Sequence, residues 1–165
     1  MPNWVDNNVV IMGPREDLYH LLEVANSLAA DENTSTLFSL EKLRPMPVEL
    51  IGTNAPADNP NWYNWCMMNW GTKWDIEVTS IDKTQDNSVS FGFLSAWSPP
   101  LEAFQYASKQ FPSLEISIRY AEPGMGFAGS AYYAGGKLKH SEEYEMTTEM
   151  VDYYINTGQI LRNNL

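Results

Sequence analysis

Few side chains in this sequence are of the types that carry out nucleophilic or metal chemistry. The chain has two histidines, His20 and His140, and a single cysteine, Cys66. A structural Cys/His zinc site takes about four such ligands, and a nucleophilic hydrolase needs a nucleophile beside an activating base. No serine lies in a Gly-x-Ser-x-Gly turn. The sequence therefore predicts no catalytic residue, no metal site and no cofactor.

Carboxylates are abundant and gather near the C-terminus. The acidic positions there are Glu142, Glu143, Glu145, Glu149 and Asp152. Ser141 is a suitable N-cap and Gly158 a suitable end, so we predict an acidic C-terminal helix. Its charges, with Tyr144 and Tyr153 among them, would lie within about three helical turns, and could imitate a run of phosphates in a basic groove. The alternative is an ordinary solvated helix face.

A second constellation is aromatic. It comprises Trp62, Tyr63, Trp65, Trp70 and Trp74. Packing within the core is one interpretation, and a protein interface anchored by exposed Trp62 and Trp65 is another. Base stacking on the same rings is a third, but nucleic-acid sites surround such rings with Lys and Arg, and only Lys73 is near in the sequence.

Two further groups of residues are candidates for functional sites: the glycines between residues 124 and 136, and the carboxylates Asp75 and Glu77. The glycines from Gly124 to Gly136 lack the Gly-Lys-Ser/Thr ending of a phosphate loop, so we interpret them as loop bends and a strand bulge. Asp75 and Glu77 could serve an enzyme that uses an added divalent ion, which is the third and weakest functional hypothesis.

The elements that must position these residues follow from periodicity. Apolar alternation predicts strands at 9–12, 74–79, 88–93 and 114–120, with a tight turn around Asp86-Asn87 and a further short strand at 131–133. Helical spacing predicts a helix that begins at Pro14 and another after Ser98, its expected N-cap. Trp62 and Trp65 lie on a short helix that Gly71 is placed to end.

Strand, helix, strand, strand, helix, strand is the order of the split βαβ arrangement. We therefore predict an α+β ferredoxin-like sandwich, with a four-stranded antiparallel sheet and two helices on one face. We expect one domain over residues 1–165, with an aromatic-rich insertion at about 31–73 and a C-terminal extension at about 122–165. The other sheet face would need a cover from the insertion, the terminal helix or a partner protein.

Composition limits the partners. Asp and Glu number 21 against 10 Lys and Arg in 165 residues, a net charge of -11. This balance argues against direct nucleic-acid binding and favours a partner protein with a basic surface, although solubility alone also explains it. One cysteine excludes an intramolecular disulfide, and no apolar run has signal or membrane-spanning length. We expect a cytoplasmic protein without membrane contact, and a homo-oligomer is left open.

Several short motifs occur in a fixed order. They are residues 8–13 (NVVIMG), 38–40 (FSL) with 45–47 (PMP), 70–75 (WGTKWD), 96–100 (AWSPP), 120–124 (YAEPG) and 127–129 (FAG). Through these motifs the chain resembles the YubB ferredoxin-like family of plasmid and bacteriophage proteins over roughly residues 3–136. The resemblance implies the ferredoxin-like fold and a mobile-element, bacterial host setting, and it supplies no catalytic residues.

Together these observations favour a non-enzymatic phage or plasmid accessory protein that binds a host or element-encoded protein. The expected activity is inhibition of a nucleic-acid-handling defence complex, of the anti-CRISPR or anti-restriction type. The expected contact residues are Glu142, Glu143, Glu145, Glu149, Asp152, Tyr144, Tyr153, Trp62 and Trp65. The alternative is a nucleic-acid or nucleotide-binding module that uses the sheet and the tryptophan cluster.

Overall fold

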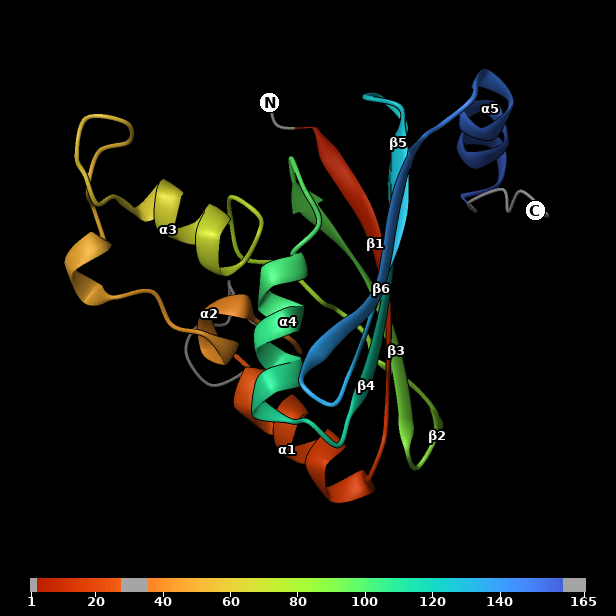
Figure 1. Cartoon of the computed structure of the whole chain (residues 1–165), viewed down its shortest axis with the longest axis horizontal. Coiled ribbons are helices and arrows are strands. Elements are labelled where there is room, and N and C mark those ends of the chain that lie inside the picture. Colours follow the sequence, from red (N-terminus) through yellow and green to blue (C-terminus); the bar gives the residue numbers. More distant parts are fainter. Residues whose placement is uncertain (1–2, 28–35, 159–165) are drawn as a thin grey trace.

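The computed structural model describes residues 3–27 and 36–158. The elements are β1 (Trp4–Met12), α1 (Arg15–Ala25), α2 (Leu40–Leu43), the 3-10 helix η1 (Val48–Leu50), α3 (Trp62–Asn69), β2 (Asp82–Gln85), β3 (Ser88–Ala96), α4 (Leu101–Gln110), β4 (Glu115–Glu122), β5 (Phe127–Ala134), β6 (Lys137–Glu145) and α5 (Thr148–Thr157). Figure 1 shows the sheet edge-on, with α1 to α4 on one side and α5 on the other.

One antiparallel sheet holds all six described strands in the order β2-β3-β1-β4-β5-β6. β1 is central, and Val9 lies opposite both Phe91 of β3 and Ile118 of β4. The first four strands with α1 and α4 make the split βαβ arrangement, so the predicted ferredoxin-like α+β fold is confirmed. The predicted number of four strands was wrong, because β5 and β6 extend the sheet beyond β4.

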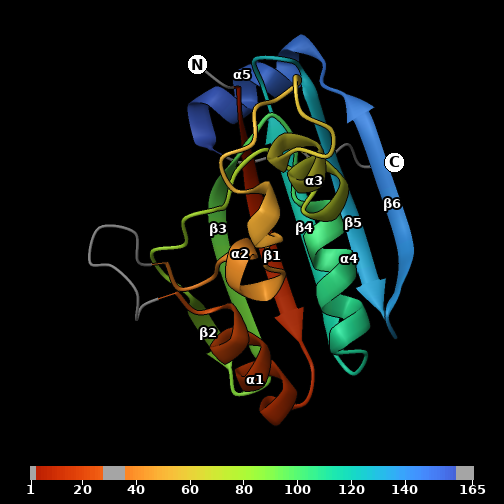
Figure 2. The same cartoon turned by 90° about the vertical axis from the view of Figure 1, so that its left-hand side faces the viewer.

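The main core lies between the sheet and the layer of helices α1 to α4, which Figure 2 shows in front of the sheet. Every second residue of β1 is buried, and Val9 and Ile11 are fully buried in this core. Leu21 of α1 and Phe104 of α4 close the core from the helical layer. Burial of these side chains supplies the main driving force for the fold.

The insertion between α1 and β2 lies on the same side as α1 and α4 (Figures 1 and 2). Asn61 begins α3, because its side chain accepts a hydrogen bond of 2.9 Å from the amide of Asn64. Trp65 packs edge-to-face on Trp70 with ring centroids 5.4 Å apart, and the Trp70 indole donates to the Arg44 carbonyl. The described part of the insertion is thus built around aromatic side chains.

Residues 74–79 do not form the predicted strand. Ile76 and Val78 are buried as their spacing predicts, but the Val78 amide donates to the Thr36 hydroxyl at 2.7 Å and not to a neighbouring strand. The hairpin instead uses β2 and β3 around Asp86-Asn87. The alternation of apolar and polar residues correctly indicates that Ile76 and Val78 are buried. It does not show that the segment is a strand, because an extended loop can bury the same side chains.

The predicted acidic helix from Ser141 onward was also wrong. Residues 137–145 form β6, and α5 begins only at Thr148, after the cap residue Thr147. Gly135 and Gly136 have φ of 60° and 74°, which is the geometry of a two-residue hairpin turn. This turn pairs residues 137–145 with β5, so that segment gains sheet hydrogen bonds in place of a helical start.

Among the described residues, the second side of the sheet is covered at one end by α5. Helix α5 packs there through Met150, with Ala121 and Ala128 of the strands and Met146 of the connecting segment forming a small second core. The Tyr154 hydroxyl donates a hydrogen bond to Asp6 of β1, which joins α5 to the centre of the sheet. Of the three covers considered for this face, the terminal helix is the one found at that end of the sheet.

Candidate functional site

Three exposed tryptophans lie where β1 begins and β3 ends. Trp4, Trp74 and Trp97 are 46%, 41% and 47% exposed. The rings of Trp4 and Trp74 are in contact, with centroids 6.2 Å apart. Trp4 pairs with Ala96 in the sheet. Trp97 follows Ala96 in the chain and therefore lies at the same end of the molecule. We call Trp4, Trp74, Trp97 and the adjacent Lys73 the tryptophan surface.

The backbone of Trp97 is held in a left-handed conformation. Its φ of 72° makes it the sole non-glycine residue with positive φ in the described part of the chain. Such a conformation costs about 1–3 kcal/mol for a residue with a side chain. The Trp97 amide donates to the Asn3 carbonyl at 2.9 Å, and the Ser95 hydroxyl donates to the Ser98 carbonyl at 2.8 Å. The turn is therefore fixed on both sides of the strained residue.

Residues 70–72 support this turn from below. The buried Thr72 hydroxyl donates to the Ala96 carbonyl at 2.9 Å, and the Ser98 hydroxyl donates to the Gly71 carbonyl at 2.5 Å. Ser98 thus ties two loops together and does not cap α4 as predicted; the N-cap of that helix is Pro100, without a side-chain hydrogen bond. Gly71 has φ of 86° and a Cβ there would lie 3.2 Å from backbone atoms of α4, so glycine is required.

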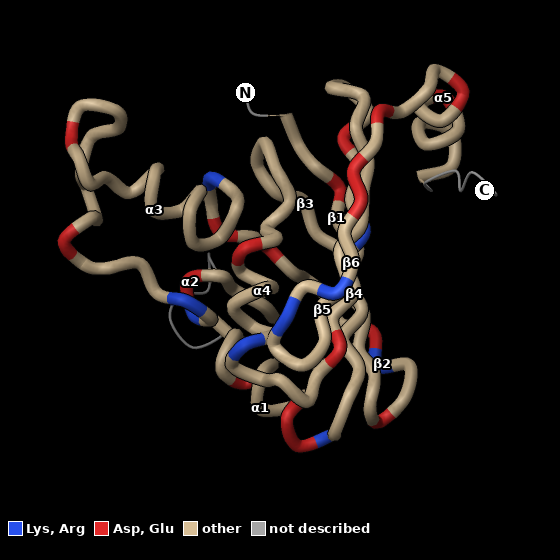
Figure 3. The backbone as a smooth tube through the Cα atoms, in the orientation of Figure 1, with Lys and Arg blue, Asp and Glu red and all other residues tan. Residues whose placement is uncertain are grey.

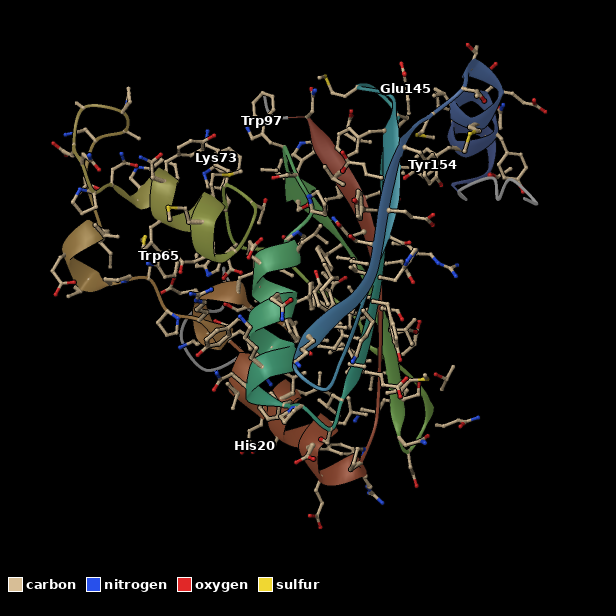
Figure 4. The ribbon with its side chains drawn as sticks, in the orientation of Figure 1. His20, Trp65, Lys73, Trp97, Glu145 and Tyr154 are labelled. Atoms are coloured by element: carbon tan, nitrogen blue, oxygen red, sulfur yellow. The ribbon has the colours of Figure 1, made fainter. Side chains whose placement is uncertain are left out.

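The charge of this surface differs from that of the whole molecule. The ammonium group of Lys73 lies 4.5 Å from the centroid of the Trp74 ring, a cation–π contact. Asp75 is turned away, because its carboxylate accepts hydrogen bonds of 2.6 Å from the Ser39 hydroxyl and from the Leu40 amide. Figure 4 shows Lys73 and Trp97 at the same end of the molecule, above α4.

The structure does not bring the sequence-predicted contact residues into one patch. Trp62 and Trp65 lie on α3, half-buried against the main core. Trp65 also lines a hollow of about 400 Å³ formed by residues between Asn59 and Asn69. Glu142, Glu143, Tyr144 and Glu145 lie on β6, and Glu149, Asp152 and Tyr153 on α5. Figure 4 places Trp65 on α3 in the helical layer, far from Glu145 at the end of β6.

The acidic residues form two groups and not one helical run. Along β6 the side chains alternate, so the Glu142 carboxylate accepts from the Ser130 hydroxyl at 3.2 Å, while Glu143 accepts from the Tyr120 hydroxyl at 3.1 Å on the other face. Glu149 lies in the first turn of α5. Figure 3 shows the acidic positions following β6 and continuing onto α5.

Two tyrosines that donate hydrogen bonds to carboxylates, Tyr120 to Glu143 and Tyr154 to Asp6, are held in the neutral form. Burial, followed by the charge of Glu143 and its hydrogen bond, raises the pKa of Tyr120. Burial and the hydrogen bond to Asp6 raise the pKa of Tyr154. Both hydroxyls therefore act as hydrogen-bond donors at neutral pH, and their role in this arrangement is to fix strands and α5 in place.

The candidate reactive groups have structural surroundings. Burial and the nearby Glu41 and Asp75 charges raise the pKa of the Cys66 thiol to about 11, which disfavours the nucleophilic thiolate. His20 packs edge-to-face on Phe111 with centroids 5.3 Å apart. Within the described ranges, no group of three or more His, Cys, Asp and Glu side chains could hold a metal ion. None of the helices in those ranges is long and apolar enough to cross a membrane.

Sequence reasoning missed Trp4 and Trp97 as surface residues. Trp97 stands directly before Ser98-Pro99-Pro100, and a bulky aromatic in a turn segment of this kind is a signal for exposure. Its contact with the 70–74 loop could not be read from spacing, because the two segments are brought together only by the β1–β3 pairing and by the buried hydrogen bonds of Thr72 and Ser98.

Comparison with known proteins agrees with this fold. The crystal structure of protein api92 from Yersinia pseudotuberculosis superposes with a TM-score of 0.50 at 22% sequence identity, over 66% of this chain and 40% of that one. The chain thus spans less than half the length of that protein. No curated protein is significantly similar to the chain. The family model of the ferredoxin-like domain in Api92-like protein matches residues 73–158, from before β2 to the end of α5, which is more than half of the chain. This chain therefore belongs to the family of ferredoxin-like domains in Api92-like proteins.

Proposed function

We propose that this chain is a non-catalytic protein-binding module whose main contact surface is the tryptophan surface. The observation that supports this most directly is the exposure of Trp4, Trp74 and Trp97 at one end of the fold, with Trp97 in a left-handed conformation fixed by neighbouring hydrogen bonds. Strained residues persist where the surroundings over-determine them, and they cluster at functional sites. Tryptophan is also enriched among the residues that supply most interface energy.

A protein partner fits this surface better than a nucleic acid does. Lys73 is its only charged member, whereas binding of a phosphate backbone relies on several Lys and Arg. The net charge of -11 would also repel a polyanion. A basic protein is attracted by the same charge, and its Arg or Lys side chains can stack on the indole rings, as Lys73 already does on Trp74.

The narrower proposal concerns the setting. The resemblance to plasmid and bacteriophage proteins supports an accessory role in the cytoplasm of a bacterial host, with a nucleic-acid-handling defence complex as the partner. Such complexes carry basic grooves, and an acidic inhibitor would associate quickly with one of them. In this proposal the carboxylates of α5, Glu149 and Asp152, add to the electrostatic attraction of the basic partner, and the tryptophan surface forms the close contact.

Affinity capture with matched variants tests the main proposal. The wild-type chain and a Trp74→Ala/Trp97→Ala variant are immobilised and exposed to a panel of purified candidate defence proteins. Met125→Ala is the control, because Met125 is 66% exposed in the turn between β4 and β5. We expect one partner to bind wild type and the control alike, and the double variant at least tenfold more weakly. Equal binding by all three would contradict the assignment of the surface.

A parallel titration tests the nucleic-acid alternative. Single-stranded and duplex oligonucleotides are added at low salt while tryptophan fluorescence is followed. We expect no saturable change; a salt-sensitive quench that Trp97→Ala removes would replace the protein-binding proposal. Reversal of Glu149 and Asp152 to Lys tests the acidic version separately, because unchanged inhibition of a defence complex after that reversal would exclude it.

A further inference from the structure

Strand β6 forms a long free edge of the sheet. It is nine residues long, last in the strand order, and exposed at all positions except Tyr144. Figure 2 shows it at the outer margin, and no described strand lies against its outer side. The opposite edge, β2, has only four residues. An exposed edge presents a row of backbone N–H and C=O groups that can pair with another strand.

The charges along β6 are segregated about its centre. Basic residues precede Ser141 and acidic residues follow it, in the order Lys137, Leu138, Lys139, His140, Ser141, Glu142, Glu143, Tyr144, Glu145. If a second β6 pairs antiparallel with Ser141 opposite Ser141, then Lys137 faces Glu145 and Lys139 faces Glu143. His140 faces Glu142, and Leu138 faces Tyr144. Directly opposite charges of unlike sign stabilise such a pair of strands.

This register is the one that the charges favour. If the two strands move by one residue so that the acidic halves overlap further, Glu145 faces Leu138 and Lys139 faces Tyr144, so no Lys lies directly opposite a Glu. A step in the other direction keeps only the pairing of Lys139 with Glu142 as a direct contact between Lys and Glu. Register is set by such patterns where backbone pairing alone would accept several alignments.

We propose that β6 is a homodimerisation edge, and that its occupant is the β6 strand of a second copy in this Ser141-centred register. The contact is isologous, because the same residues serve both copies through a two-fold axis at Ser141. The two six-stranded sheets then continue into one another. This proposal uses a different surface from the tryptophan surface and does not depend on the proposed function.

Edge charges have another known role that the test must separate. Lysines and bulges on an edge strand discourage unwanted pairing, and β6 has a register shift between its partners Tyr132 and Tyr133. Preventing unwanted strand pairing requires only that the edge carries charges, in any order along the strand. Self-pairing needs the order that β6 has, with opposite signs at equal distances from Ser141.

Charge variants of the full chain distinguish the two roles. In sedimentation velocity over a range of concentrations, we expect the wild type to shift from 18.7 kDa toward twice that mass. Lys137→Glu/Lys139→Glu makes the edge uniformly acidic, and Glu143→Lys/Glu145→Lys makes its first and last thirds basic. We expect each double variant to remain monomeric alone, because each then meets its own copy with like charges.

Mixing the two double variants is the decisive measurement. Every substituted position then faces an opposite charge, so a one-to-one heterodimer should form. The fourfold swap Lys137→Glu/Lys139→Glu/Glu143→Lys/Glu145→Lys keeps the net charge of -11 and should dimerise like the wild type. Circular dichroism confirms that each variant is folded. A wild type that stays monomeric, a double variant that still dimerises, or a mixture without heterodimer would each overturn the proposal.

Discussion

Trp97 combines two properties that rarely occur together in one residue. It carries a large exposed aromatic ring, and its φ of 72° lies in the region that favours glycine. The strain is held by the pairing of Trp4 with Ala96 and by the hydrogen bonds of Ser95 and Ser98. A sequence optimised for stability alone would place glycine here, so the choice of tryptophan supports the contact role that we propose for this surface.

A matched pair of substitutions measures this strain. Trp97→Gly and Trp97→Ala remove the same indole ring, but only glycine adopts the left-handed backbone without a steric penalty. We expect the glycine variant to be more stable than the alanine variant by about 1 kcal/mol, as measured by urea unfolding of both. Both variants should lose partner binding. An alanine variant as stable as the glycine variant would show that the turn is not strained.

Cys66 gives a second prediction for a single residue. Since the pKa of its thiol rises from 9.0 to about 11 on folding, the folded state is not penalised below pH 9, and its stability falls as pH rises from 9 toward 11. Native protein at about pH 8 should not react with a disulfide reagent, whereas unfolded protein should react fully. Cys66→Ala should lose less stability than the wild type between those pH values. Rapid labelling of the native protein would contradict the burial of this thiol.

The β5–β6 hairpin extends the four-stranded ferredoxin-like sheet to six strands. The turn at Gly135-Gly136 directs residues 137–145 back along β5, which places one continuous strand at the sheet edge. On β5, Gly129 lies opposite Tyr120 on one side and Glu143 on the other. A Cβ at Gly129 would collide with the Tyr120 hydroxyl and the Glu142 carbonyl, so this close packing requires glycine.

Two strand glycines allow a controlled test of this packing. Gly129→Ala should destabilise the protein by roughly 1–3 kcal/mol, because the added methyl group forces β6 and Tyr120 apart. Gly92→Ala on β3 is the control, since its Cβ would lie an ordinary 3.5 Å from the Asn7 carbonyl. Thermal unfolding compares the two with the wild type. Equal effects of both substitutions would mean that the Gly129 contact can relax without cost.

At the scale of the whole molecule, charge and shape would act on different steps of the binding that we propose. The net charge of -11 is spread over the strand edge, α5 and the loops (Figure 3), so it acts at long range on any basic partner. The tryptophan surface is local, and its rings contribute only after contact. Association should therefore follow from the overall charge, and the lifetime of the complex from the rings.

This division predicts distinct kinetic effects. Raising the salt concentration from about 0.05 to 0.3 M should slow association with a basic partner several-fold while the dissociation rate changes little, because screening weakens long-range attraction. Trp97→Ala should instead speed dissociation. Surface plasmon resonance measures both rates. A salt-independent association rate would show that net charge has no part in recognition.

The architecture could be predicted from the sequence in outline, since the alternation in residues 88–93 and 114–120 and the helical spacing after Pro14 identify elements of the βαββαβ order. The segment from 137 to 145 could not, because Ser141 followed by glutamates satisfies the local rules for a helix start equally well. The pairing with β5 decided between the two, and it depends on a Gly-Gly turn whose meaning is clear only when both flanking strands are recognised.

The sequence by itself determined the sign and size of the net charge, the scarcity of reactive groups and the ferredoxin-like fold class in outline, because these depend on composition and on local periodicity. The second strand of that fold was expected at 74–79 and lies at 82–85. Only the tertiary structure decided where the tryptophans and the carboxylates lie. Sheet pairing placed Trp4 beside Ala96, and the buried hydrogen bonds of Thr72 and Ser98 joined two distant loops. Trp65 on α3 and Glu145 at the end of β6 lie far apart. Contacts between residues far apart in the chain follow from register and packing, which no local pattern encodes.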